Sequence, residues 1–180
     1  MLRLTVPSLV LVGALLGGCG PAGKAPPASP TAARPVITAA DHNTTLAAVG
    51  DYLKGLGWQV RPDSAQKRLI VVSPKGSKFG LGATMGGKGE LNHLVMFKAF
   101  LPKPENKGSP KILELVAKVS NNVNGVIYQV SDDQAVVCAT WVYFLETLDP
   151  TLVIRTLELL DQVAIVVMAA QAPDLVKMLE

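Results

Sequence analysis

Cysteine and histidine are scarce in this sequence of 180 residues, which contains two of each. Two cysteines cannot build a disulfide framework or a cysteine-rich zinc site, and two histidines limit any histidine-based chemistry. Charged residues are also few, at 17%, whereas 49% of the residues are hydrophobic. A chain of this composition is not disordered as a whole, and its length fits one ordinary domain rather than two.

The beginning of the chain, residues 1–18, has the pattern of a secretory signal peptide. Arg3 is its only charge, an almost wholly apolar run spans 9–16, and small residues follow. The run is too short to cross a bilayer of about 30 Å comfortably as a helix. The residues at the end of this run, Leu16-Gly17-Gly18-Cys19, resemble the lipobox of bacterial lipoproteins. We therefore predict a lipoprotein signal peptide over 1–18, with an ordinary signal peptide and a chance cysteine as the alternative.

The lipobox resemblance implies a lipid anchor on Cys19. It implies cleavage before this residue, diacylglycerol on its thiol and usually a third acyl chain on the new amine. Two or more acyl chains anchor a protein stably, whereas one binds a membrane marginally. Gly20 follows the cysteine, and the inner-membrane retention residue, Asp, is absent. The predicted location is the bacterial cell envelope, at the outer membrane facing the periplasm if the cell is Gram-negative.

Lipidation of Cys19 would leave Cys138 as a lone thiol. Cys138 lies in the apolar run Val136-Val137-Cys138-Ala139-Thr140. In an oxidising compartment a lone thiol is expected to be buried or paired with another molecule. We predict a buried position in a strand, with a reactive or intermolecular thiol as the alternative.

The segment 19–40 has the composition of a tether. It is rich in proline and alanine, has no Asp or Glu and shows no apolar periodicity. Such a segment is flexible to semi-extended and joins the lipidated cysteine to the domain. The predicted domain spans 41–180, which is enough to bury roughly two-thirds of its unfolded surface.

Hydrophobic periodicity predicts an α+β fold for this domain. Apolar residues spaced by three and four indicate helices over 44–56, from 110 to about 120 and over 151–171, with a short helix after Pro173; Asn43, Thr44 or Thr45 can cap the first of these. Strands are predicted at 58–60, 68–72, 79–85, 91–101, 126–131 and 135–145. The order is α-β-β-β(-β)-α-β-β-α, and the short turns require an antiparallel sheet flanked by helices. The strand 91–101 is apolar on both faces, which favours cover on both faces.

Three segments together resemble a known family. They are the helix and turn LAAVGDYLKGLGW at 46–58, the helix LELVAKVSNN at 113–122 and the hairpin GVIYQVSDDQAVV at 125–137. In this order they are similar to the YbjN family of bacterial sensory-transduction regulator-like proteins, which share the type III secretion chaperone-like fold. The resemblance implies the same α+β fold, no catalytic motif and a protein-binding role. Chaperones of that fold bind extended segments of partner proteins and are often dimers, but they work in the cytoplasm, whereas this chain carries a lipobox.

The motifs that carry enzyme chemistry are incomplete in this sequence. The glycine-rich segment 82–89 nearly matches a phosphate-binding loop, but Gly89 stands where Ser or Thr must bind Mg²⁺, and a strand is predicted where a helix should follow. His42 and His93 have no His or Cys partner at ligand spacing, and no nucleophile-elbow motif is present. The pair Asp132-Asp133 is typical of a solvated turn. We therefore predict no catalytic residue, no metal site and no cofactor.

Two regions remain as candidates for contact with a partner. Gly80 and Gly82 lack side chains on one strand face, so another backbone could approach there, or a helix of the same domain could fill the space. The apolar end of the third helix, which includes Ile165, Val167 and Met168, is either core or an interface with a partner or a second copy.

Charge is unevenly divided along the chain. Residues 54–118 carry twelve basic and four acidic side chains, whereas 119–180 carry two basic and eight acidic ones. The basic and acidic regions either pair with each other or are solvated. Alternatively, the basic region contacts an anionic partner or lipid head groups.

The sequence thus predicts a membrane-anchored, non-catalytic, protein-binding or chaperone-like and regulator-like lipoprotein of the bacterial envelope. Its partners would be the membrane, through Cys19, and a protein, with a homodimer as one form and no nucleic acid. The alternatives are an enzyme with an unrecognised site, which a deep pocket holding perturbed acids would support, and a purely structural envelope protein.

Overall fold

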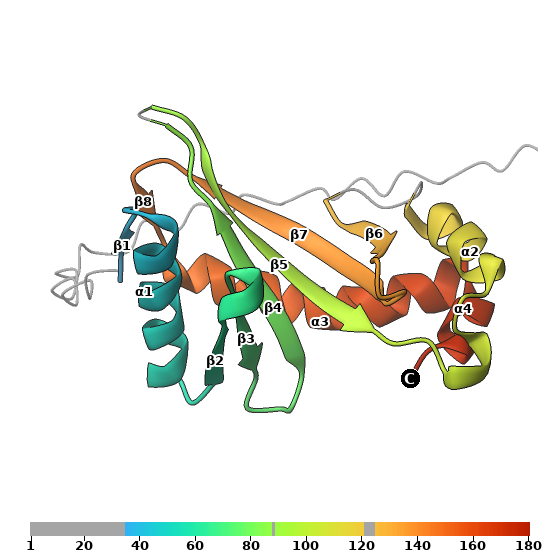
Figure 1. Ribbon diagram of the computed structural model, residues 1–180. Coiled ribbons are helices and arrows are strands. Elements are labelled where there is room, and N and C mark those ends of the chain that lie inside the picture. The colour runs from blue at the N-terminus through green and yellow to red at the C-terminus, as the bar shows by residue number, and fades with distance from the viewer. Residues whose placement is uncertain (1–34, 88, 121–124) are drawn as a thin grey trace, which may run out of the picture. The chain divides into compact units, whose positions relative to one another are not determined.

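The computed structural model describes residues 35–87, 89–120 and 125–180. The predicted signal peptide, Cys19 and most of the predicted tether lie outside these residues. The domain contains a six-stranded antiparallel sheet in the order β2-β3-β4-β5-β7-β6 (Figure 1). Its strands are β2 (Gln59–Asp63), β3 (Arg68–Val72), β4 (Lys78–Thr84), β5 (Asn92–Phe100), β6 (Ile127–Val130) and β7 (Val136–Phe144).

Helices precede, interrupt and follow the strands of this sheet in the predicted order. They are α1 (His42–Gly55), α2 (Pro110–Ser120), α3 (Pro150–Gln171) and the short α4 (Pro173–Met178), with 3₁₀ turns at η1 (Ser64–Gln66) and η2 (Pro104–Asn106). The α+β class, the antiparallel pairing and the flanking helices are therefore confirmed.

The first helix begins two residues earlier than predicted. Asp41 is its N-cap, and the Asp41 carboxylate accepts hydrogen bonds from the backbone N–H groups of Asn43 and Thr44 at 2.8 and 3.0 Å. The prediction that Asn43, Thr44 or Thr45 caps the helix is therefore wrong. A carboxylate at this position satisfies the free N–H groups of the first turn and also meets the positive end of the helix dipole.

One face of the sheet carries the hydrophobic core. Alternate strand residues such as Leu81, Leu94 and Met96 are fully buried there. Helices α1 and α3 lie on this covered face, where Leu53 and Leu157 join the same cluster. Because side chains of a strand alternate between the two faces, the intervening residues of the same strands point to the opposite side.

The opposite side of the sheet, the open face, carries no α-helix of the described residues (Figure 1). Val95, Phe97 and Trp141 are only half-buried on it. The prediction that both faces of the strand 91–101 are covered is therefore wrong for the described part of the chain. Apolar residues on both faces of a strand do not reveal whether a second layer is present, since much of any protein surface is apolar.

A second, two-stranded sheet ties the N-terminal end of the described chain to the domain. Strand β1 (Ile37–Thr38) pairs antiparallel with β8 (Thr147–Leu148), and Ile37 is buried in the core cluster. Residues of the segment 19–40 therefore pair with the domain, N-terminal to its expected start at residue 41. Strands of two residues are too short to give a periodic signal in the sequence.

Candidate functional site

The open face is hollowed into a groove at one end of the sheet. The groove has a volume of about 600 Å³. Its lining includes Gly80, Phe97, Ala99 and Val137 from strands β4, β5 and β7, together with the turn between β6 and β7. These side chains share one face because the register places Gly80 opposite Phe97 and Phe97 opposite Ala139.

The ring of Phe97 lies directly over Gly80. A Cβ atom added at Gly80 would stand only 2.0 Å from Cζ of Phe97, closer than any real contact. At Gly82 the corresponding atom would lie 3.1 Å from Cγ1 of Val95. The space over Gly80, predicted to admit another backbone or a helix of the same domain, is therefore filled by an aromatic side chain of the neighbouring strand.

Opposite charges border the two sides of this groove. Arg68 stacks on Phe97 with its guanidinium carbon 5.3 Å from the ring centroid, and exposed Lys78 lies on the same side. Asp132 and Asp133 lie exposed in the turn across the groove. A hydrogen bond from the Ser131 hydroxyl and, more weakly, the charge of Arg68 lower the pKa of Asp133, so this carboxylate is ionised at neutral pH.

An aromatic strip continues the open face beyond the groove. Val95 pairs with Trp141 across β5 and β7, and His93 pairs with Tyr143, whose rings lie 5.7 Å apart. Aromatic residues that are neither fully buried nor isolated are enriched at the centres of protein interfaces. Chemically, the open face offers an apolar floor, stacking surfaces and charges of both signs.

The partner-binding residues predicted from the sequence do not come together. Gly80 and Gly82 lie on the open face, whereas α3 packs on the covered face. On α3, Met168 is buried and Val167 packs against the core, so of the two alternatives for the apolar helix end the structure places Met168 in the core. Ile165 is 45% exposed, and its neighbour Val166 is 65% exposed. The helical period divides the apolar segment into an inner and an outer face.

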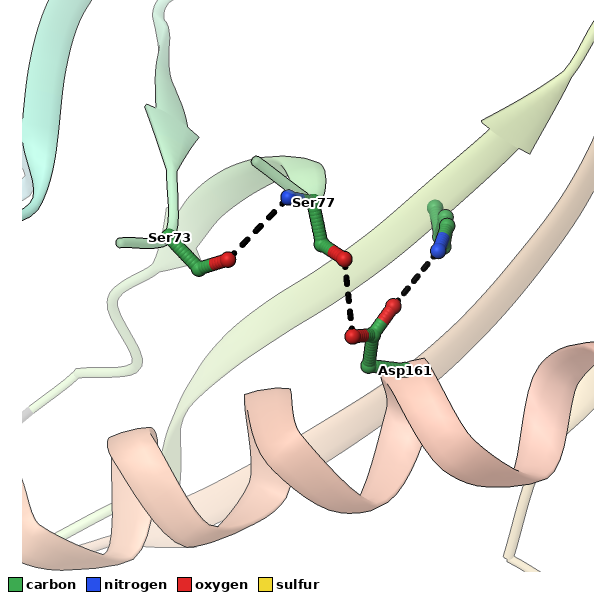
Figure 2. Close-up of polar contacts among 4 residues, drawn as sticks. Ser73, Ser77 and Asp161 are labelled. Carbon is green, nitrogen blue, oxygen red and sulfur yellow. Dashed lines mark hydrogen bonds and ion pairs between the residues drawn. The ribbon is translucent and has the colours of Figure 1, made fainter. Parts of the chain in front are cut away.

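A polar cluster links the covered face of the sheet to α3. The Lys98 ammonium lies 2.5 Å from Oδ1 of Asp161, and the Ser77 hydroxyl donates to Oδ2 at 2.7 Å (Figure 2). Ser77 is itself fixed by Ser73, whose hydroxyl oxygen accepts its backbone N–H (Figure 2). Burial alone would raise the pKa of Asp161, but the hydrogen bonds from Lys98 and Ser77 outweigh it, and the net pKa is lowered. A carboxylate held in this way is a weak base, so the cluster has the chemistry of a structural cross-link between β5, the β3–β4 turn and α3.

The remaining residues of chemical interest are placed apart from one another. Both ring nitrogens of His42 lie 2.7 Å from backbone carbonyl oxygens, those of Ala83 and Lys67. Cys138 is buried in β7, as predicted, and burial raises the pKa of its thiol to about 11. Within residues 35–87, 89–120 and 125–180, no group of three or more His, Cys, Asp or Glu side chains could hold a metal ion.

The glycine-rich segment 82–89 begins inside β4, whose last residue is Thr84, and precedes β5. Strand β5 follows it, not a helix whose N-terminus could face a phosphate. The described part of the chain has no helix that is long and apolar enough to cross a membrane.

Comparison with known proteins gives no family. No protein-family model and no curated protein matches the chain. A solved structure, an uncharacterized protein from Methanothermobacter thermautotrophicus, is similar with a TM-score of 0.47 and 17% sequence identity, over 72% of this chain and 97% of that chain. The resemblance to the YbjN family stays a prediction.

Sequence reasoning missed Phe97, Arg68 and Trp141. Each lies within a strand whose position was predicted, but its role depends on which residue of the next strand stands beside it. Gly80 was a usable signal, because a glycine inside a strand often marks close approach of another group. The identity of that group, Phe97, required the register between β4 and β5.

Substituting Gly80 with alanine is expected to displace the Phe97 ring and to lower the free energy of unfolding by roughly 1–3 kcal/mol, the usual cost of overpacking. Urea unfolding would measure this change. Gly82→Ala is the matched control, because its Cβ would meet a methyl group at 3.1 Å and a small shift relieves the contact. The double variant Gly80→Ala, Phe97→Leu is expected to recover part of the loss, and no recovery would show that the ring is not the cause.

Proposed function

We propose that this chain is a bacterial envelope lipoprotein whose domain binds another protein through the open face of its sheet. The observation that carries the proposal is the open face itself, with its groove, half-buried aromatic side chains and bordering charges. The lipobox-like segment ending at Cys19 supports the anchor, and Gly20 supports the outer membrane as its site in a Gram-negative cell. The role is that of a binding or chaperone-like component, without nucleic acid as a partner.

A polypeptide fits this surface better than a small molecule does. Small-molecule sites are concave and bury most of the ligand among a few convergent polar groups. Here the apolar residues run across several strands, and the charged side chains stand at the borders of the groove. An apolar centre with a polar border is the usual anatomy of a protein–protein interface.

The charges that border the groove favour a partner segment that carries both signs. Arg68 is already paired with Asp63 at 2.9 Å, so it contributes mainly by stacking on Phe97. Lys78 on one side and Asp132 and Asp133 on the other are exposed. Exposed charges of this kind set orientation and association rate more than affinity, and salt screens them.

Site-specific photocrosslinking in native membranes tests the proposal. A photoreactive residue would replace Ala99, which is exposed in the groove, and in a matched variant Ala169, which is exposed on α3. We expect one reproducible protein adduct from position 99 and none from position 169, identified by mass spectrometry of the lipidated protein. Adducts with only the chain itself, or none at position 99, would contradict a protein-binding open face and would favour a structural lipoprotein or a small-ligand site.

A further inference from the structure

Five large apolar side chains are exposed at one end of the domain. Their exposed fractions range from 45% for Leu152 to 61% for Tyr143. We call this set the N-terminal apolar patch; it consists of Val36, Leu91, Tyr143, Leu145 and Leu152. Single exposed apolar residues are ordinary on a protein surface, but several gathered in one place mark an interaction site.

The lining of one hollow and the register of β5 and β7 place these residues at the same end of the domain. Val36, Tyr143 and Leu152 line one hollow of about 310 Å³. Leu91 precedes Asn92, whose side-chain amide donates to the carbonyl oxygen of Leu145. The register also sets Asn92 opposite Phe144, so Leu91 and Leu145 flank the same strand pair. Figure 1 shows the β4–β5 hairpin, β8 and β1 at this same end of the domain.

The chain reaches the domain at this patch. Pro35, the first described residue, and Val36 both line the hollow. Cys19 stands sixteen positions earlier in the sequence. A segment of that length spans at most about 55 Å when fully extended, at about 3.4 Å per residue. A lipid anchor on Cys19 would therefore keep the patch within reach of the bilayer that holds the acyl chains.

We infer that the N-terminal apolar patch rests in the head-group region of this bilayer, as a second membrane contact beside the lipid. The inference rests on the proposed anchor at Cys19. The anchor makes the second contact intramolecular, with an effective concentration of the order of millimolar, so a weak apolar contact is sufficient. Tyrosine favours the interface between lipid and water, and leucine and valine gain free energy when they leave water.

The charges beside the patch limit how deeply it enters. Glu90 and Glu146 are exposed next to Leu91 and Leu145. Their carboxylates have to stay among the head groups and water, because an ion in the hydrocarbon is costly. They also give no attraction to anionic lipids. The contact is therefore shallow and apolar, and salt should weaken it little.

This contact would orient the domain. The patch lies where β5 begins and β7 ends, whereas the groove lies where β5 ends and β7 begins. The nine residues of β5 separate the two ends by about 30 Å, at 3.4 Å per residue. A domain that rests on its N-terminal apolar patch would hold the groove away from the lipid surface, open to a partner.

Fluorescence of the full lipidated chain in vesicles tests this inference. An environment-sensitive dye would be attached to a cysteine that replaces Leu145, and in the matched control to one that replaces Val166, an exposed apolar residue on α3. The buried thiol of Cys138 should not react. In vesicles of phosphatidylethanolamine and phosphatidylglycerol with brominated acyl chains, we expect several-fold stronger quenching at position 145 than at position 166. Added salt should leave the difference unchanged.

Further variants and conditions separate the outcomes. Leu91→Asp with Tyr143→Asp should reduce quenching at position 145 to the level at position 166 while the protein still floats with the vesicles. Equal quenching at both positions in vesicle-bound protein overturns the inference and leaves the anchor intact. A dye at position 145 that is already shielded without vesicles overturns it too, because protein then covers the patch. The Cys19→Ser variant, which lacks the lipid, should not float with the vesicles. If the full chain also fails to float, the proposed anchor is wrong and the inference fails with it.

Discussion

Replacing Asp161 with asparagine is expected to lower the free energy of unfolding by roughly 2–3 kcal/mol, somewhat less than the 3–5 kcal/mol lost when one partner of a fully buried ion pair is removed. The reason is the position of Lys98. Its side chain is 15% exposed, and its ammonium lies 5.7 and 5.5 Å from the ring centroids of Phe79 and Phe100 on the covered face. Without the Asp161 carboxylate, the Lys98 ammonium stays largely buried but has lost its counter-ion.

The same pair predicts how stability depends on pH. The folded-state pKa of Asp161 is below its ordinary value, so the folded protein binds this proton less readily than the unfolded chain does. The contribution of Asp161 to the free energy of unfolding is therefore fully present above its pKa in the unfolded chain, about 3.9. It is lost as the pH falls through its lower pKa in the folded protein. The difference between the wild type and Asp161→Asn should be constant near neutral pH and should shrink below about pH 4.

Two further variants control this experiment. Asp174→Asn removes an ion pair of similar length, 3.0 Å to Lys177, but both side chains are more than half exposed. Its effect should stay within the ~0–1 kcal/mol of surface pairs. Lys98→Met in the Asp161→Asn background should recover part of the loss, because the uncompensated charge is gone. Chemical unfolding of all four proteins gives the comparison, and equal losses for Asp161→Asn and Asp174→Asn would refute the role of burial.

Local patterns predicted most of this fold because most of it is locally determined. The periodicities over 44–56 and 151–171 correspond to α1 and α3, and the strand 68–72 is β3. The errors concern the ends and the smallest elements. Asp41 caps α1 instead of Asn43, Thr44 or Thr45, and β1 and β8 have two residues each. A cap or a single pair of bridges leaves little trace in a periodic pattern.

The candidate site was less predictable because its residues meet through tertiary structure. Lys98 and Asp161 are 63 positions apart, and their pairing depends on which face of β5 receives α3. Phe97 covers Gly80 only in the register that joins β4 to β5. The apolar residues on both sides of the strand 91–101 favoured cover on both faces, but only the arrangement of the helices decides that one face stays open. The positions of the strands could therefore be predicted from the sequence, whereas the groove could be found only once the pairing of the strands was known.

The apolar end of α3 gives the other large effect. Met168→Ala is expected to lower the free energy of unfolding by about 2–4 kcal/mol, because it removes a side chain that is 1% exposed and leaves a cavity in the core. Val166→Ala, two positions earlier on the outer face, should change it by less than about 0.5 kcal/mol. Guanidinium unfolding of both variants measures the contrast, with the dependence on denaturant expected to stay that of the wild type.

This experiment distinguishes the two interpretations of the apolar end of α3, as part of the core or as an interface with a second copy. Ala164 and Met168 are one helical turn apart and face the core, whereas Ile165 and Val166 face outward. If the helix acts only within its own domain, the loss for Met168→Ala is independent of protein concentration. A second copy seated on the outer face would instead make Val166→Ala costly as well, and that cost would grow with protein concentration, because association adds to apparent stability by mass action. Measuring both variants over a range of concentrations therefore tests the core assignment of Met168 and self-association through Val166 in one experiment.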